Sequence, residues 1–278
     1  MKKAIIIFIL IFNLIGDENK FVIGCRPSGF FSNFLSALIN IRWAEKNNKI
    51  PVVWCQWHSP YYQVDGYNGS KNVWEYYFES ISELNFKEGD KSYWQYAAID
   101  GFEIPSLDAV SYSPKFRNLF HSIIKKYIKI KPNIQNKINV FYKKNMHNKK
   151  NIGIHLRGTD KFTEVQPVDT KVIFNCANKL AKKLGKNCQF FVATDEERLL
   201  DLAKSNLQGK VIAYTSHRSQ NSNPVWDFYL HNRAILGEEV LIESQLLSKC
   251  NYFIHTISNV SIAVCYFNPR LKNILLRN

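Results

Sequence analysis

The chain lacks the short motifs that mark the commonest nucleotide and metal sites in proteins. It contains no G-x-G-x-x-G, no H-E-x-x-H and no Asp-x-Asp. Gly24 and Gly29 are spaced like the opening of a P-loop, but Phe30 and Phe31 follow where that loop requires Lys and then Ser or Thr. These absences exclude a P-loop, a dinucleotide fingerprint and a zincin site. They also leave no acidic pair of the kind that holds a divalent cation beside a diphosphate.

Cysteine is sparse, and its spacing carries no metal signature. No two of the six cysteines form a C-x-x-C pair, so a zinc site is not expected. Most of them lie in apolar runs, which predicts buried free thiols. The even number permits disulfides, although the spacing does not argue for them. The cysteines are Cys25, Cys55, Cys176, Cys188, Cys250 and Cys265.

The composition is that of a folded protein with a strong positive charge. The 278 residues are 46% hydrophobic and 14% aromatic, which suits one large or two modest domains and excludes a disordered chain. The 37 Lys and Arg against 23 Asp and Glu give a formal charge of +14. This charge reflects either a bias toward Lys and Asn, or attraction to an anionic partner such as a nucleotide, a nucleic acid or a membrane surface.

The first twenty residues combine a basic start with an apolar run. Met1-Lys2-Lys3 precedes the run Ala4 to Phe12, an arrangement that resembles a signal peptide but has no clear cleavage site. The run is short for a transmembrane helix. It is read either as a buried first strand or as a signal or membrane-anchoring segment (1–20), associating with a membrane through residues 4–16. Cytoplasmic and lumenal, anchored locations both stay open.

The first half of the chain has the order of an α/β unit. Strands are expected at 21–24 and 50–54, with a helix over 34–45 between them. This order opens a doubly wound domain. A helical pattern over 115–142 is interrupted at Lys131-Pro132, and the polar stretch 143–151 is interpreted as a junction between two lobes.

Strands alternate with helices more regularly in the second half. Such alternation predicts a mainly parallel sheet with ligands at the carboxyl ends of its strands. We therefore expect an α/β protein of two Rossmann-like lobes, 21–150 and 151–278, facing a central cleft as in the GT-B architecture. The expected strands of the second lobe are 151–156, 189–193, 210–214 and 252–255, and the expected helices are 169–184, 196–205, 237–248 and 259–266.

The most informative stretch runs from His155 to Lys161. An apolar strand pattern ends there in His-Leu-Arg-Gly-Thr-Asp-Lys, as at the edge of a sheet that carries an active site. Arg157 is the expected partner of a diphosphate, since its planar guanidinium gives two parallel hydrogen bonds. The stretch resembles the His-x-Arg-x-x-Asp motif of GDP-fucose-dependent fucosyltransferases, namely the α1,6-, nodulation and protein O-fucosyltransferases. The resemblance covers roughly residues 153–269, in three blocks.

The first block supplies the proposed chemistry. In the family, the arginine that matches Arg157 contacts the β-phosphate of the donor and stabilises the charge of the departing GDP. Position 158 is Gly, where some α1,6-enzymes carry a second arginine, and Lys161 would partly compensate. Glu164 stands one residue closer to the Asp-Lys pair than the proposed catalytic glutamate of those enzymes. It is read as the general base or as a solvated loop residue, with Asp169 as a competing base.

The other two blocks add residues to the expected donor site. By the resemblance, His155 and Asp160 belong to that site with Lys161, and Asp195 lies near the guanine base and ribose. Asp195 alternatively caps a helix. The remaining expected donor-binding residues are Glu243, which is otherwise a surface or salt-bridged residue, and Ser258 and Asn259, which otherwise cap a helix whose N-terminus would face a phosphate.

The acceptor side is assigned from weaker signals. A glycine-containing loop at 28–33 resembles the first loop of the family that faces the cleft, which points to Gly29 and Asn33. The aromatic segment 57–78 begins with Trp57 and His58. Clustered aromatic rings either stack on sugars or pack in the interior. The polar loop with His217, Arg218 and Asn221 either approaches the donor or acceptor or is solvated, and solvation is the preferred interpretation.

The resemblance implies an inverting, metal-independent enzyme without a cofactor. It would transfer L-fucose from GDP-fucose to a hydroxyl of a glycan, glycolipid or glycoprotein. A transferase for another nucleotide sugar and a non-catalytic glycan- or nucleotide-binding protein remain alternatives. Binding to nucleic acid, which the charge alone would allow, is not expected because no nucleic-acid-binding module is recognisable.

Overall fold

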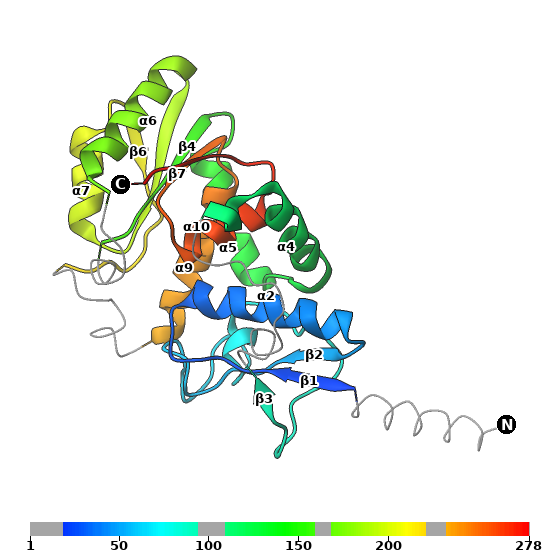
Figure 1. Ribbon diagram of the computed structural model, residues 1–278. Coiled ribbons are helices and arrows are strands. Elements are labelled where there is room, and N and C mark those ends of the chain that lie inside the picture. Colours follow the sequence, from blue (N-terminus) through cyan, green and yellow to red (C-terminus); the bar gives the residue numbers. More distant parts are fainter. Residues whose placement is uncertain (1–18, 94–108, 159–167, 221–231, 278) are drawn as a thin grey trace, which may run out of the picture. The chain divides into compact units, whose positions relative to one another are not determined.

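A computed structural model describes residues 19–93, 109–158, 168–220 and 232–277 (Figure 1). The chain divides into two compact units. Unit 1 consists of residues up to 104 together with 123–129, and unit 2 of 105–122 together with 130–278. This division differs from the expected boundary at residue 150. Helix α5 (Pro132–Asn145) belongs to unit 2 because it packs against α9 (Arg233–Ser248) in the same unit.

Unit 1 contains the expected β-loop-α-β order. Strands β1 (Lys20–Ile23) and β2 (Ile50–Val53) pair in parallel, with α2 (Phe30–Lys46) between them in sequence. The short strand β3 (Ser92–Tyr93) pairs with the other side of β1, which gives the order β2-β1-β3. Helix α2 begins before the expected residue 34, because its first residues Phe30 and Phe31 are buried rather than exposed in a loop.

Most of the aromatic segment packs in the interior of unit 1. Tyr76, Tyr77 and Phe78, in and after the 3-10 helix η1 (Val73–Tyr76), are almost fully buried. The Trp74 ring stacks on Phe34 of α2, with ring centroids 6.0 Å apart. For these residues the packing interpretation is the correct one.

Two helices precede the second sheet. They are α4 (Pro114–Tyr127) and α5, and the 3-10 helix η2 (Ala109–Tyr112) comes before them. The predicted interruption at Lys131-Pro132 is confirmed, because Pro132 occupies the first turn of α5, where a missing N–H costs nothing. Among the described residues, no helix is long and apolar enough to cross a bilayer.

The second sheet confirms the predicted parallel arrangement. Its order is β6-β5-β4-β7-β8, so the chain winds outward from β4 first in one direction and then in the other. The sequence prediction missed the last strand, which is a partly exposed edge strand. The elements are β4 (Lys150–Leu156), α6 (Thr170–Leu184), β5 (Cys188–Thr194), α7 (Glu197–Asn206), β6 (Lys210–Ile212), α9, β7 (Tyr252–His255), α10 (Asn259–Phe267) and β8 (Lys272–Leu275).

The core of unit 2 lies on both faces of this sheet. Alternate residues of β4, including Ile152 and Ile154, pack with Phe174 of α6 in one apolar cluster. On the other face, a Cβ atom at Gly153 would stand 3.0 Å from Leu247 Cδ2 and from Cys250 Sγ. Glycine at this position therefore lets the end of α9 approach the strand closely.

A disulfide corrects the expectation for two of the cysteines. Cys25 and Cys55 are bonded, with their Cα atoms 5.0 Å apart. Each lies two residues beyond its strand, and the last pair in the register of those strands is Ile23 with Val53. Parallel pairing thus brings together two cysteines that are thirty residues apart in sequence. The other four cysteines are free, as expected, but only Cys250 and Cys265 are buried, whereas Cys176 and Cys188 are partly exposed.

Candidate functional site

The loop that carries Arg157 is anchored to the neighbouring strand. Arg157 directly follows β4 and is partly buried. The next backbone N–H, of Gly158, donates a hydrogen bond of 2.9 Å to Asp195 Oδ1, just after the end of β5. A carboxylate bonded to a backbone N–H is a strong, charge-assisted contact. The guanidinium is therefore carried on a backbone that is fixed by the sheet before it and by Asp195 after it.

The glycine at position 158 has a steric cause. A Cβ atom there would lie 2.0 Å from Glu196 Oε2 and 2.9 Å from Leu199 Cδ1. Glu196 is itself buried, and its Oε1 accepts a 2.7 Å hydrogen bond from Arg198 Nε. The carboxylate of Glu196 thus takes the space in which a second arginine of the family pattern would begin.

Two other predicted residues meet where the sheet changes its winding direction. His155 lies near the end of β4, and Ser258 follows β7, the strand next to β4 on the other side. The Ser258 hydroxyl is 3.5 Å from His155 Nδ1. A crevice at such a switch point, at the carboxyl ends of parallel strands, is the usual ligand site of this architecture.

Ser258 acts mainly as the cap of α10. Its hydroxyl accepts a 3.0 Å hydrogen bond from the Ser261 N–H and lies 2.8 Å from the Ser261 hydroxyl. The capping alternative is therefore correct for this side chain. Asn259 is the first residue of the helix and is partly exposed.

Tyr112 completes this network and was not anticipated from sequence. Its hydroxyl lies 2.8 Å from the Ser261 hydroxyl and accepts a 3.3 Å hydrogen bond from the Ser258 N–H. Burial, partly offset by these hydrogen bonds, raises the pKa of Tyr112 to about 12. The phenol therefore stays protonated at physiological pH. Tyr112 lies 146 residues from Ser258 in sequence, so no local pattern signals the contact.

His255 is a neutral imidazole beneath the same helix start. It is fully buried between Phe253 and Tyr112, with ring centroids 4.4 Å and 4.9 Å away. Its Nδ1–H donates to the Thr256 carbonyl at 3.1 Å, and no partner is found for Nε2 within the described parts of the chain. Burial lowers the pKa of His255 to about 4, because the interior disfavours the charged ring.

Carboxylates of α9 hold the loop that follows β6. Glu243 Oε1 accepts hydrogen bonds from Arg218 Nη2 at 3.1 Å and from the Ser216 hydroxyl at 2.8 Å. Glu239 accepts from both the backbone N–H and the Nδ1 of His217, at 2.9 Å and 2.8 Å. Burial raises the pKa of Glu243 to about 7, although Arg218 and Ser216 act in the opposite direction. The loop near Arg218 is thus held by hydrogen bonds to α9, although His217 stays exposed to solvent.

The predicted residues of unit 2 fall into three groups. Asp160, Lys161 and Glu164 lie outside the described residues. Asp169 caps α6 by accepting a 2.9 Å hydrogen bond from the Lys171 N–H. No group of metal-ligating side chains occurs in the described part of the chain. The residues gathered at the carboxyl edge of the second sheet, or on the helix beside it, are His155, Arg157, Asp195, Glu243, Ser258 and Asn259.

The predicted acceptor residues of unit 1 separate into buried and exposed ones. Asn33 uses its side chain within the loop, accepting from the Arg26 N–H and donating to the Arg26 and Ser28 carbonyls, all at 3.0 Å. Gly29 stands just before α2. Trp57 is 68% exposed, and its ring centroid lies 3.6 Å from that of His58. An exposed tryptophan of this kind is free to stack on a ligand.

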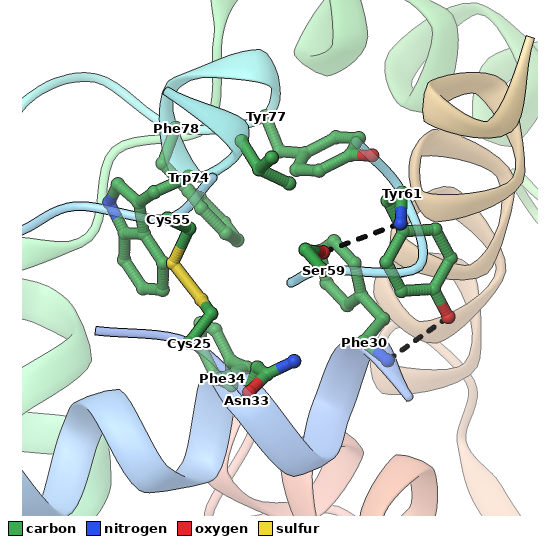
Figure 2. Close-up of a pocket in the computed structure, with 11 residues that line it drawn as sticks. Cys25, Phe30, Asn33, Phe34, Cys55, Ser59, Tyr61, Trp74, Tyr77 and Phe78 are labelled. Atoms are coloured by element: carbon green, nitrogen blue, oxygen red, sulfur yellow. Dashed lines mark hydrogen bonds between the residues drawn. A yellow bond between two sulfur atoms is a disulfide. The ribbon is translucent and has the colours of Figure 1, made fainter. Parts of the chain in front are cut away.

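A small pocket lies within unit 1, beside the disulfide (Figure 2). Its volume is about 30 Å³, and aromatic rings make up most of its wall. That volume holds about one or two water molecules, or a methyl-sized group, and not a sugar ring. Figure 2 shows the side chains of Tyr61, Trp74 and Tyr77 around it, and the Tyr61 hydroxyl accepts a 3.0 Å hydrogen bond from the Phe30 N–H.

The chain resembles known proteins in its structure but not detectably in its sequence. No protein-family model matches the chain, and no curated protein matches it significantly. Among solved structures, it is similar to the NodZ α1,6-fucosyltransferase soaked with GDP-fucose, at 16% identity and a TM-score of 0.60, over 91% of this chain and 94% of that one. The same enzyme co-crystallised with GDP gives 17% identity and a TM-score of 0.57, over 91% and 93%.

A third structure, selenomethionine NodZ from Bradyrhizobium, gives 18% identity and a TM-score of 0.57, over 93% of this chain and 94% of that one. At sequence identities this low, the structural likeness establishes the fold alone. The chain therefore has a mixed α/β fold with parallel, Rossmann-like sheets, of the kind found in these fucosyltransferases.

Proposed function

We propose that the protein is a fucosyltransferase that transfers L-fucose from GDP-fucose to a hydroxyl of a glycan, glycolipid or glycoprotein. The observation that carries the proposal is the coincidence of two independent features. The fold is that of NodZ, whose structures were obtained with GDP-fucose and GDP. The His-x-Arg motif lies at the carboxyl end of β4, beside the switch point of the second sheet.

Arg157 would bind the diphosphate and stabilise the charge that develops as GDP departs. Its supporting interactions would come from the start of α10. The Ser258 N–H already donates to the Tyr112 hydroxyl, and the Ser258 hydroxyl already accepts from the Ser261 N–H. The first helical N–H groups, of Asn259 and Val260, have no partner within an α-helix. We therefore assign phosphate binding at this helix to its backbone and to the Asn259 side chain.

The acid–base step would need a carboxylate near the acceptor hydroxyl. Glu164 is the proposed base, and Asp169 is a poorer candidate because its side chain caps α6. Attack on the side of the sugar opposite to GDP inverts the anomeric configuration, which converts a β-linked donor into an α-fucoside. Arg157 and the start of α10 would balance the diphosphate charge without a metal ion. His155, Asp160, Lys161, Asp195 and Glu243 are proposed to complete the donor site.

Unit 1 would bind the acceptor. The pocket beside the disulfide is too small for a sugar, so Trp57 with His58 is the better candidate, because an aromatic face can stack on the C–H surface of a pyranose. Gly29 and Asn33 would shape the loop before α2 and not contact the acceptor, since the Asn33 side chain is already bonded within that loop.

The test of the donor site is calorimetric titration without metal. GDP, GDP-fucose, GDP-mannose and UDP-glucose are titrated into the wild type, Arg157→Ala and Arg270→Ala. Arg270 is an exposed arginine of the same unit beside the start of β8, so it controls for loss of one positive charge. We expect binding of GDP and GDP-fucose that is lost in Arg157→Ala and kept in Arg270→Ala, together with a loss of transfer of about 100-fold or more.

Each contrary result has a definite meaning. Tighter binding of GDP-mannose or UDP-glucose than of GDP-fucose would indicate a transferase of another specificity. Tight GDP binding with no turnover on any acceptor would indicate a non-catalytic nucleotide-binding protein. Near-wild-type transfer by Arg157→Ala would overturn the proposed mechanism.

A further inference from the structure

The amino ends of the strands in the second sheet carry a dense set of cations. Helices of a parallel α/β sheet run against the strands, so their carboxyl ends lie at the same edge as the strands' amino ends. Exposed Lys and Arg side chains occur at nearly every such position of unit 2. The basic edge consists of Lys143, Lys144, Lys149, Lys150, Lys182, Lys183, Lys186, Lys204, Lys210, Lys249, Arg270 and Lys272.

Several contacts join these segments along one edge. The Lys150 N–H donates to the Asn187 carbonyl at 3.0 Å, and Asn187 Nδ2 donates to the Asn148 carbonyl at 3.1 Å. These two bonds tie the start of β4 to the turn between α6 and β5. The ammonium group of Lys249, after α9, lies 5.6 Å from the ring centroid of Tyr142 in the last turns of α5. Parallel pairing also places Lys150 beside Cys188, Gln189 beside Lys210 and Tyr252 beside Lys272, so the amino ends of the strands lie next to one another along this edge.

The chain segments that form the basic edge carry almost no negative charge. The segments 133–159, 170–194, 202–226 and 244–278 contain no Asp or Glu. Lys204 pairs with Asp201 at 3.0 Å and more distantly with Glu197, but the other cations of the basic edge form no ion pair with a described carboxylate. Most of this positive charge is therefore not neutralised by the protein itself.

Helix stability explains only part of the pattern. Cations in the last turn favour a helix because its carboxyl end is partly negative. This accounts for Lys143, Lys144, Lys182, Lys183 and Lys204. The Lys150 ammonium group also donates to the carbonyl of Leu184, the last residue of α6, at 3.4 Å. Helix stability does not account for Lys210 and Lys272, which begin strands, or for Lys149 and Lys186, which lie in the connecting turns.

We propose that the basic edge binds the surface of an anionic lipid bilayer. Five neighbouring strands span roughly 20 Å, so the cations are spread over a broad area and not along one narrow groove. Two aromatic rings at this edge, Tyr142 and Tyr252, are only partly exposed and lie beneath the ammonium groups of Lys249 and Lys272. The edge therefore lacks the open aromatic platform that single-stranded nucleic acids use. A bilayer meets such a surface through its headgroups alone.

The apolar run at residues 4–12 supplies a second membrane-directed feature in the sequence. Stable attachment of a peripheral protein generally needs two signals, one apolar and one polybasic. A bilayer at the basic edge would also leave the opposite, carboxyl edge of the sheet open to a soluble nucleotide sugar. The inference concerns a different surface from the proposed donor site, so the two can be tested separately.

Vesicle co-sedimentation of the full chain tests the inference. The vesicles are phosphatidylcholine alone or phosphatidylcholine with phosphatidylglycerol, at low and high salt. The edge variant is Lys149→Glu/Lys186→Glu/Lys272→Glu. The control variant, Lys71→Glu/Lys91→Glu/Lys125→Glu, makes the same change in net charge at exposed positions of unit 1. GDP binding by both variants checks that the fold and the donor site are intact.

We expect binding that requires phosphatidylglycerol and weakens with salt. The edge variant should partition about 100-fold or more less strongly, since each lysine near such a surface contributes about 5-fold, and the control should change much less. Equal binding to neutral vesicles, or equal loss in both variants, would overturn the inference. So would a basic edge that binds single-stranded oligonucleotides but not vesicles.

Discussion

At the scale of single residues, Gly158 links the proposed diphosphate contact to the packing behind it. Its N–H is bonded to Asp195, and the space of its missing side chain is filled by Glu196 and Leu199. A side chain at 158 would have to displace a buried carboxylate or move the backbone that carries Arg157.

Gly158→Ala is therefore expected to lower the free energy of unfolding by about 1–3 kcal/mol, as overpacking usually does. It should also weaken GDP binding, because the backbone shift moves Arg157. Urea unfolding and GDP calorimetry measure the two effects. Gly29→Ala is the stability control, since a Cβ there would meet no atom within 4 Å. Unchanged stability and GDP affinity in Gly158→Ala would mean that the Glu196 side chain can move aside without a cost in free energy.

Residues that directly follow apolar strands were predictable. His155, Arg157 and Asp195 each stand at or just beyond the end of a strand whose apolar run is plain in the sequence. The contacts that surround these residues were not predictable in the same way. The role of Glu196 against Gly158 and the bond of Tyr112 to Ser258 depend on packing between distant segments, for which a single sequence holds no signal.

At the scale of elements, the disulfide joins the loops that follow β1 and β2. The two strands are parallel neighbours, so their ends lie side by side and the bond closes a loop with a sequence separation of 30 residues. Cross-linking that many residues restricts the unfolded chain and stabilises the fold by about 3–4 kcal/mol.

Cys25→Ala/Cys55→Ala is expected to lose about that much stability, and reductant should have the same effect on the wild type but none on the variant. Thermal unfolding with and without reductant measures this. The matched control is Cys176→Ala/Cys188→Ala, which removes two partly buried free thiols from unit 2. Reductant-insensitive unfolding of the wild type would contradict the prediction.

Elements with a strong apolar pattern were found from sequence, and elements defined by their neighbours were not. The strand β4 is buried from its second residue onward, and its apolar run predicted it. The edge strand β8 is only partly buried, so its pattern is weak. The early start of α2 depends on Tyr61, whose hydroxyl accepts the Phe30 N–H in place of a side-chain cap from Gly29.

At the scale of the molecule, unit 2 separates its charges between two edges of one sheet. Cations cover the amino ends of the strands, whereas the carboxylates of Asp195, Glu239 and Glu243 lie at or near the carboxyl ends and are bonded within the protein. The positive charge that contributes to the net charge of +14 is thus distributed unevenly over unit 2, and it is not only a bias of composition. A nucleotide diphosphate would approach Arg157 in a region where the nearby carboxylates are already engaged by donors.

Two buried groups of unit 2 predict the pH dependence of folding. The pKa of Glu243 rises from 4.5 to about 7, so the folded protein holds a proton that the unfolded chain releases above pH 4.5. Its contribution to stability therefore falls as the pH rises from 4.5 to 7. The pKa of His255 falls from 6.5 to about 4, so between these pH values the unfolded chain binds a proton that the folded protein does not bind. Its contribution falls as the pH drops from 6.5 to 4.

The two slopes oppose each other between pH 4.5 and 6.5, which predicts a broad plateau of stability there. Urea unfolding of the wild type, Glu243→Gln and His255→Phe over that range and beyond tests this. Glu243→Gln should remove the decline toward pH 7, and His255→Phe should remove the decline toward pH 4. The loss of a partner for Arg218 in Glu243→Gln shifts the whole curve without tilting it, because arginine stays charged throughout. If both variants keep the wild-type declines toward pH 7 and toward pH 4, neither buried group titrates as its surroundings require.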